Sequence, residues 1–174
     1  RLIDANDVRR VHAAAVAACD ATDGVRDGVI GNPAACQWTV AEIACHAGTG
    51  SRAADGGPCL GEEKVQAFRK IYDGFRDLKG RSSYPGGLWL GSELTWLEYF
   101  VSPNDSPARL LDPSWIVGEF FRYLAFWQTP GPFGVYDFDY ERDVTRLGLM
   151  EAIYSATNPD LRRFKARDGK LILV

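Results

Sequence analysis

Three aspartates lie close together near the start of the chain. The segment Cys19–Ile30 reads CDATDGVRDGVI and places Asp20, Asp23 and Asp27 within eight residues. Carboxylates this close repel one another unless solvent or a cation separates them, and Ca²⁺ takes oxygen ligands from carboxylates and from backbone carbonyls. The segment is therefore a candidate calcium site, with a pair of solvated Asp-Gly turns as the alternative.

Backbone carbonyls would complete such a site. Val25 and Val29 could supply them, while Gly24 and Gly28 allow the tight turns that wrapping around an ion requires. The spacing differs from that of an EF-hand, which needs oxygen ligands at alternate positions and a Glu at the twelfth. The pattern alone leaves both interpretations of the segment open.

Four cysteines allow three disulfide pairings. Separations of 17 residues from Cys19 to Cys36 and 14 from Cys45 to Cys59 favour two successive closed loops without fixing the pairing. A zinc site is the competing hypothesis, although the chain has no Cys-x-x-Cys and His46 is the only nearby histidine. Disulfides form in oxidising compartments, so we expect a secreted or periplasmic protein.

Composition excludes several classes of partner. The 174 residues are 46% hydrophobic and 12% aromatic, which is enough for one domain with a real core. Twenty Lys and Arg against 23 Asp and Glu give a net charge of −3, and no basic cluster could neutralise a row of phosphates. No run approaches the roughly 20 apolar residues of a membrane span. We expect neither a nucleic acid nor a membrane as partner.

The pattern of apolar residues predicts a helix-rich, loop-heavy chain with little sheet. Helical spacing predicts helices over residues 5–18, 61–74, 93–101, 115–127 and 141–156, and a short one after Asn158. The chain closes on Leu171-Ile172-Leu173-Val174, an unbroken apolar run typical of a strand buried on both faces. We therefore predict a strand over 170–174.

Several motifs resemble the tannase and feruloyl esterase family. They are ACDATDGVRDGVI and NPAAC, then YPGG at 84–87, GSE at 91–93, DFD at 137–139, and the closing ATNPDL, FKAR and GKLIL. In that family an α/β-hydrolase core carries a large inserted lid. The resemblance implies an α/β-hydrolase parent in which 1–136 form the helix- and loop-rich lid domain. Residues 137–174 would return to the core and end in a buried core strand.

The resemblance also implies specific site residues. A structural Ca²⁺ would be bound by the side chains of Asp20, Asp23 and Asp27 and by the carbonyls of Val25 and Val29. The implied disulfides are Cys19–Cys36 and Cys45–Cys59. A second acidic cluster, Asp137, Asp139 and Asp143, could hold a second metal, but the family likeness favours a structural hinge where the lid returns to the core.

The implied activity is that of a serine carboxylic-ester hydrolase acting on aromatic esters, of the tannase, feruloyl esterase or terephthalate-monoester hydrolase type. Family members carry the nucleophile in Gly-Cys-Ser-x-Gly, whereas Ser92 here lies in LGSEL. His12 sits in a helical apolar pattern, and His46 follows a cysteine rather than preceding one. We therefore expect the catalytic Ser, Asp and His outside this chain, in the rest of the core.

Aromatic residues crowd positions 89–127, and most are expected to form the core of the lid itself. Arg122 lies among them, where a lone charge is costly, so it either pairs with a carboxylate such as Glu119 or meets a substrate carboxylate. Terephthalate-monoester hydrolases use a lid Arg and a nearby Phe, which implies Arg122 and Phe126 as substrate-binding residues. The alternative function is a non-catalytic extracellular module, linked by calcium and disulfides, that binds an aromatic or carbohydrate ligand.

Overall fold

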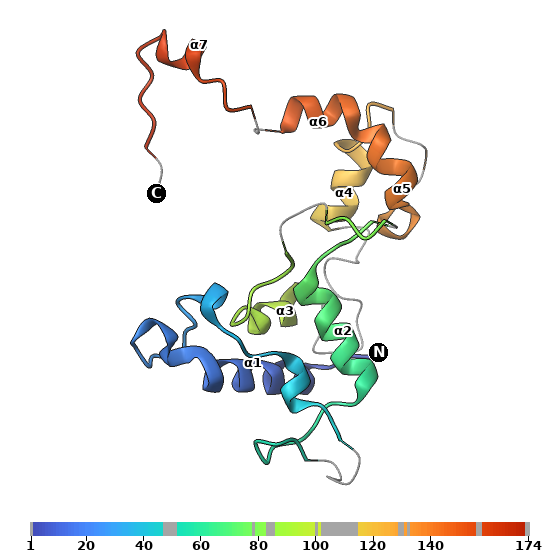
Figure 1. The fold of residues 1–174 in the computed structure, drawn as a ribbon. Helices are drawn as coiled ribbons and strands as arrows, with labels where there is room; N and C mark the ends of the chain where they lie inside the picture. Colours follow the sequence, from blue (N-terminus) through green and yellow to red (C-terminus); the bar gives the residue numbers. More distant parts are fainter. Residues whose placement is uncertain are drawn as a thin grey trace. The chain divides into compact units, whose positions relative to one another are not determined.

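The computed structural model describes residues 2–46, 52–77, 79–82, 86–99, 101, 115–128, 131, 133–155 and 158–172. The chain divides into two compact units, Arg1–Gly118 and Glu119–Val174. Helices are its regular elements, and the described residues contain isolated β-bridges in place of strands (Figure 1). This confirms the predicted helix-rich chain with little sheet. None of the described helices is both long and apolar enough to cross a bilayer.

Helix α1 (Ala5–Cys19) confirms the first predicted helix. It begins at a capping box, in which Asp4 Oδ1 accepts the backbone N–H groups of Asn6 at 2.7 Å and Asp7 at 3.0 Å. Asp7 Oδ2 accepts the N–H of Asp4 at 2.9 Å in return. This reciprocal arrangement satisfies donors that the first turn would otherwise leave unpaired. The start of α1 is thus encoded by residues within one helical turn.

The rest of the N-terminal unit consists of short helices joined by loops. Its elements are η1 (Asp20–Asp23), η2 (Pro33–Ala35), η3 (Val40–Ile43), α2 (Glu62–Asp73) and α3 (Glu93–Tyr99). Both α2 and α3 lie inside the predicted helical ranges. Lys64 of α2 pairs with Asp7 of α1, with 2.6 Å between Nζ and Oδ2, and this ion pair links the two helices.

The core of the N-terminal unit lies between α1, α2, α3 and η3. Trp96 of α3 is fully buried, and its ring centroid lies 5.9 Å from that of Phe68 and 5.3 Å from that of Tyr72, both on α2. Burying one such large side chain contributes about 1.5–3 kcal/mol. Further fully buried side chains are Val8, Val11, Val40, Ile43 and Val65. Trp96 therefore fixes α3 against α2.

The C-terminal unit is built from shorter elements. They are α4 (Ile116–Tyr123), within which the unit boundary falls, then η5 (Val135–Asp137), α5 (Tyr140–Asp143), η6 (Val144–Leu147), α6 (Gly148–Tyr154) and α7 (Arg162–Lys165). The helix predicted over 115–127 ends at Tyr123, because the N–H groups of Leu124 and Ala125 both bond to the carbonyl of Phe120.

The single helix predicted over 141–156 is also corrected. The segment is divided into α5, a 3₁₀ turn and α6. Thr145 lies in that turn and donates its hydroxyl to the carbonyl of Arg142 at 2.9 Å. A side chain that bonds to the backbone in this way competes with the regular helical pattern. Helical spacing of apolar residues alone could not indicate this interruption.

The buried strand predicted over 170–174 is not formed in its described part. Leu171 is 57% exposed and Ile172 is 83% exposed, and residues 169–172 have no regular structure. A strand needs backbone partners, and none of the described residues pairs with this segment. Leu173 and Val174 lie outside the described residues. The apolar pattern predicts burial, but burial of a strand requires a neighbouring sheet, which the described residues do not provide.

Candidate functional site

The aspartate loop is organised by its own backbone. Asp20 Oδ1 accepts the N–H groups of Asp27 at 3.1 Å and Gly28 at 3.0 Å. Asp23 Oδ2 accepts the N–H of Gly31 at 3.1 Å. Asp23 and Asp27 also each accept, through Oδ1, the N–H group two residues further on. All three carboxylates thus fold the loop back on itself through short-range hydrogen bonds.

The donor types in this loop fit Ca²⁺, but their arrangement is not a ready-made cage. The carboxylates and the carbonyls of Val25 and Val29 are the hard oxygen ligands that Ca²⁺ takes. In the described part of the chain, however, no group of three or more His, Cys, Asp or Glu side chains could hold a metal ion. Both oxygens of Asp23 accept backbone N–H groups. The calcium site, including its five ligands, stays a prediction.

Two disulfides close the loops on either side of η3. Cys19 is bonded to Cys36 and Cys45 to Cys59, with Cα–Cα distances of 5.5 and 4.8 Å. Both pairings that the family resemblance implies are confirmed, and all four cysteines are used, so the zinc alternative is excluded for them. In the chain-entropy model each cross-link of this length stabilises by about 3 kcal/mol.

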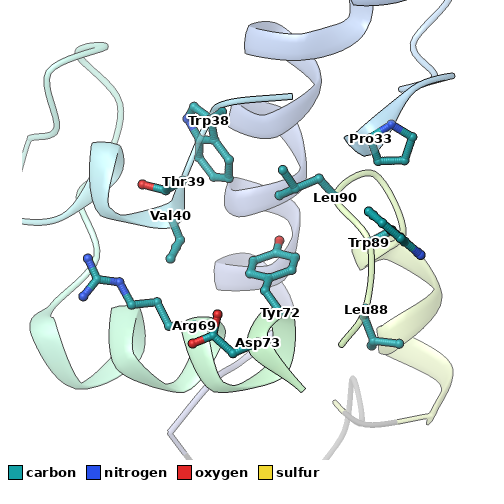
Figure 2. A pocket seen from close by; sticks show the side chains of 10 residues that line it. All are labelled: Pro33, Trp38, Thr39, Val40, Arg69, Tyr72, Asp73, Leu88, Trp89 and Leu90. Carbon is teal, nitrogen blue, oxygen red and sulfur yellow. The ribbon is translucent and has the colours of Figure 1, made fainter. Parts of the chain in front are cut away.

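A pocket with a volume of about 440 Å³ lies in the N-terminal unit. Figure 2 shows α2 contributing Arg69, Tyr72 and Asp73, with the segment 88–90 on another side and the segment leading into η3 on a third. The ring of Tyr72 and the side chain of Leu90 point into the space between these walls (Figure 2). The pocket therefore combines aromatic and aliphatic walls with two opposite charges.

Backbone hydrogen bonds fix the wall formed by segment 88–90. The N–H of Gly87 donates to the carbonyl of Tyr72 at 3.0 Å, and that of Leu88 donates to the carbonyl of Ile71 at 3.2 Å. A Cβ at Gly87 would collide with the backbone of α2, so only glycine permits this approach. At the other end the Ser92 hydroxyl donates to the carbonyl of Trp89 at 2.6 Å.

A buried glutamate supports the pocket from behind. Glu93, at the start of α3, is fully buried and accepts the Tyr72 hydroxyl at 2.7 Å and the N–H of Gly91 at 3.0 Å. His12 Nδ1 of α1 lies 2.9 Å from its other oxygen. Burial and the charge of Glu93 raise the pKa of Tyr72 well above its ordinary value, so its hydroxyl stays protonated and donates to Glu93. Three helices meet at one carboxylate.

This arrangement includes residues that the sequence analysis did not select. Glu93 appeared there only within the GSE motif, and His12 was interpreted as structural, which agrees with its contact with Glu93. Arg69 and Asp73 stand one helical turn apart on the polar face of α2, a pattern typical of a solvated surface. Nothing in the local sequence indicates that segment 88–90 lies opposite them. Trp89 belongs to the aromatic stretch expected to form mostly the core of the lid, but it is 61% exposed.

The C-terminal unit contains the two predicted substrate-binding residues in different environments. The Arg122 side chain is 52% exposed, and its Nη1 lies 3.5 Å from Glu119 Oε1, so it pairs with a carboxylate named in the sequence analysis. Phe126 is only 6% exposed. Its ring centroid lies 5.2 Å from that of Phe133 and 4.7 Å from the Arg146 guanidinium carbon. Phe126 thus belongs to the packing of this unit, and the substrate role of both residues stays a prediction.

The second acidic cluster is engaged in local contacts. Asp143 is fully buried and accepts hydrogen bonds from Arg142 at 2.6 Å, from Arg146 at 2.6 Å and from the N–H of Asp139 at 2.9 Å. The guanidinium of Arg142, together with these other donors, holds the pKa of Asp143 well below its usual range. Asp137 Oδ2 accepts the N–H of Gly134 at 2.8 Å. These carboxylates stabilise the turn around α5, and the hinge role stays a prediction.

Comparison with known proteins shows the same likeness along the whole chain. The family model described as tannase and feruloyl esterase matches residues 1–174. An uncharacterized esterase of Xanthomonas campestris pv. campestris is 25% identical over 98% of this chain and 30% of its own length. A probable feruloyl esterase B-1 of Aspergillus oryzae is 24% identical over 93% of this chain and 27% of its own length.

Solved structures agree with the sequence comparison. The crystal structure of feruloyl esterase B from Aspergillus oryzae has a TM-score of 0.66 at 25% identity, over 94% of this chain and 30% of that one. The crystal structure of an esterase from the same organism has a TM-score of 0.67 at 20% identity, over 97% and 30%. This chain therefore spans less than a third of the length of these relatives. By its match over every residue, the chain belongs to the tannase and feruloyl esterase family.

Proposed function

We propose that the full-length protein is a serine carboxylic-ester hydrolase that acts on aromatic esters, and that this chain supplies its lid and substrate-specificity portion. The observation that carries the proposal is the family match over residues 1–174. The likeness in fold to feruloyl esterase B, of which the chain covers 30%, supports it. The catalytic Ser, Asp and His belong, in this proposal, to the part of the protein outside this chain.

In such an enzyme the Ser attacks the ester carbonyl, the His accepts and returns its proton, and backbone amides stabilise the oxyanion. A lid covers that centre, excludes water and selects the acyl group. Planar aromatic acids are best bound between apolar walls through ring contacts. Arg122 and Phe126 are our proposed contacts to the acyl group, with Arg122 opposite a substrate carboxylate.

The same proposal assigns different roles to two parts of the chain. Residues 1–136 form the lid, and 137–174 lead back to an α/β-hydrolase core whose sheet receives the segment 170–174. The exposure of Leu171 and Ile172 supports this assignment, since apolar side chains of a core strand need a neighbouring sheet to cover them. The two disulfides support export to an oxidising compartment.

Ester hydrolysis by the full-length protein tests this function directly. Methyl gallate, methyl ferulate and a terephthalate monoester are the substrates, and we expect turnover of at least one, abolished when the Ser of the Gly-Cys-Ser-x-Gly motif is changed to Ala. Among these esters only the monoester carries a carboxylate, so Arg122→Ala should raise its KM about tenfold and leave that of methyl ferulate unchanged. Arg163→Ala is the control. Absence of turnover with every ester would refute the proposal.

We further propose that the loop between Cys19 and Cys36 binds a structural Ca²⁺ through Asp20, Asp23, Asp27 and the carbonyls of Val25 and Val29. Its support is the set of hard oxygen donors in one exposed loop closed by a disulfide. Each Asp23 oxygen accepts one backbone N–H and keeps a second lone pair that can bind the ion. The metal would hold the loop and take no part in ester hydrolysis.

Thermal unfolding with calcium and with a chelator tests the metal site. At a calcium concentration a hundredfold above Kd, an ion bound only to the folded state stabilises by about 2.7 kcal/mol. Asp23→Ala should abolish this difference, while Glu63→Ala, which removes an exposed carboxylate from α2, should preserve it. Equal melting temperatures of the unaltered protein in calcium and in chelator would contradict the assignment.

A further inference from the structure

We propose that the pocket between α2 and residues 88–90 binds a neutral sugar residue stacked on Trp89. This proposal concerns a binding site and does not rest on ester hydrolysis. It starts from one exposed aromatic ring at the pocket edge and from two charged side chains that have no partner among the described residues.

The first observation is the exposure of Trp89. Its side chain is 61% exposed, whereas Trp38 across the pocket is 8% exposed and Trp96 is fully buried. The turn before α3 fixes Trp89, because the Ser92 N–H and hydroxyl both bond to its carbonyl. A large, flat apolar face left in water beside a pocket of small-molecule size is typical of a ligand site. The C–H face of a sugar ring is flat and apolar enough to cover it.

The second observation is the chemistry of Arg69 and Asp73. Neither side chain has a hydrogen bond or ion pair with another described residue, and both line the pocket from α2. A guanidinium only donates hydrogen bonds and a carboxylate only accepts them, whereas a hydroxyl does both. Neighbouring hydroxyls of one sugar ring can therefore accept from Arg69 and donate to Asp73 at the same time.

The charge of the pocket selects among small ligands. Arg69 attracts an anion, but Asp73 one turn further along α2 repels it. A cation is attracted by Asp73 and repelled by Arg69. A neutral ligand rich in hydroxyls satisfies both side chains without an uncompensated charge. An aromatic carboxylate would suit the aromatic walls equally well, but Asp73 would repel its charge, so the pocket favours a sugar.

The third observation is that the walls are already formed. The hydrogen bonds from Gly87 and Leu88 to the end of α2 fix one wall, and the Tyr72 hydroxyl is anchored on buried Glu93. A pocket with fixed walls loses little conformational entropy when a ligand binds. A neutral ligand can therefore bind there through only a few contacts.

Isothermal titration calorimetry on the full-length protein tests the site with xylotriose, cellotriose and the ferulate anion as probes. We expect at least one of the two oligosaccharides to bind with a Kd in the millimolar range and ferulate not to compete with it. Trp89→Ala should weaken that binding about tenfold, and Trp89→Phe should weaken it less because a ring remains. Arg69→Gln and Asp73→Asn should each weaken it by about fivefold, because the amide replaces a hydrogen bond to a charged group with a weaker neutral one.

Two matched controls make the result specific. Trp127 is an exposed tryptophan of the C-terminal unit, and Lys70 is an exposed cation next to Arg69 that does not line this pocket. Trp127→Ala and Lys70→Gln should leave the affinity unchanged. The altered side chains are exposed, so circular dichroism should show folded variants. The proposal is overturned if neither oligosaccharide binds, if ferulate displaces it, or if Trp89→Ala binds sugar as the unaltered protein does.

Discussion

Among the described residues, each of the two units buries one carboxylate completely, and the two carboxylates are satisfied in different ways. Glu93 of the N-terminal unit contacts residues 81 and 21 positions away in the chain, namely His12 and Tyr72. Asp143 of the C-terminal unit is bonded to donors one, three and four positions away. The first carboxylate joins three helices, whereas the second stabilises a single turn.

The donors differ in charge as well as in distance along the chain. Asp143 is paired with two arginines whose side chains reach solvent. Glu93 is bonded to a partly buried tyrosine hydroxyl and a partly buried backbone amide, with His12 as its third partner. When a buried carboxylate is removed, partly buried neutral partners regain hydrogen bonds to water less readily than arginines at the surface do. Loss of Glu93 should therefore matter more.

The same contrast extends to the apolar cores. The N-terminal unit packs side chains from four elements around Trp96 and closes two loops with disulfides. In the described part of the C-terminal unit the buried apolar side chains are Ala125 and Phe126, while Tyr136, Ile153 and Tyr154 are exposed. We infer that the N-terminal unit carries most of the stability that this chain supplies by itself.

The largest expected effect follows from replacing Glu93. Glu93→Ala leaves Tyr72, the Gly91 N–H and His12 without their partner, so we expect a loss of about 3–5 kcal/mol in unfolding free energy. Glu93→Gln keeps an oxygen for Tyr72 and should cost less. Urea unfolding followed by tryptophan fluorescence measures both. A loss below about 1 kcal/mol for Glu93→Ala would show that the network is solvated, and the contrast between the units would fail.

The different ranges of these contacts explain what the sequence could predict. Helix α1 was predictable because Asp4 and Asp7 form its capping box within one turn and its apolar residues recur at helical spacing. The link between His12 and Glu93 was not, because no local pattern relates residues 81 positions apart. The 3₁₀ turn between α5 and α6 contains Thr145, whose hydroxyl donates to the Arg142 carbonyl, and the apolar pattern does not indicate this contact.

The candidate sites also differ in how far the sequence could predict them. The disulfides Cys19–Cys36 and Cys45–Cys59 followed from the family resemblance, since spacing alone allowed other pairings. The pocket was missed because it forms only where α2 meets segment 88–90, and Arg69 and Asp73 look like any solvated pair until Trp89 is seen opposite them. The strand over 170–174 was predicted from its apolar residues. Such a run indicates that a strand would be buried, but it does not show which strand would pair with it, and none of the described residues does.

A smaller effect is expected from opening the second disulfide. Replacing Cys45 and Cys59 together by serine frees a loop with 14 residues of separation, which costs about 3 kcal/mol through the unfolded state. Hydrogen–deuterium exchange read by peptide should show faster exchange in α1, α2 and α3 and little change in α5 and α6. Equal acceleration in α5 and α6 would contradict the view that the disulfides stabilise only the N-terminal unit.

The smallest effect concerns Asp143, and in the unaltered protein it appears only in acid. Because the pKa of Asp143 lies below its ordinary value of 3.8 in the folded protein, its contribution to stability is fully present above that pH. The contribution is lost as the pH falls below 3.8, since the unfolded chain then binds the proton first. Hydrogen–deuterium exchange of α5 and η6 should therefore accelerate in this acidic range.

Asp143→Asn separates this titration from general acid unfolding. The amide cannot titrate, so exchange in α5 and η6 should be faster than in the unaltered protein at neutral pH and should depend less on pH below 3.8. Asp160 is the matched control. The guanidinium of Arg162 lowers the pKa of Asp160 as well, but this pair is exposed and exposed ion pairs contribute little, so Asp160→Asn should change neither quantity. If Asp143→Asn leaves exchange in α5 and η6 as unchanged as Asp160→Asn does, the buried Asp143 contributes nothing measurable to this turn.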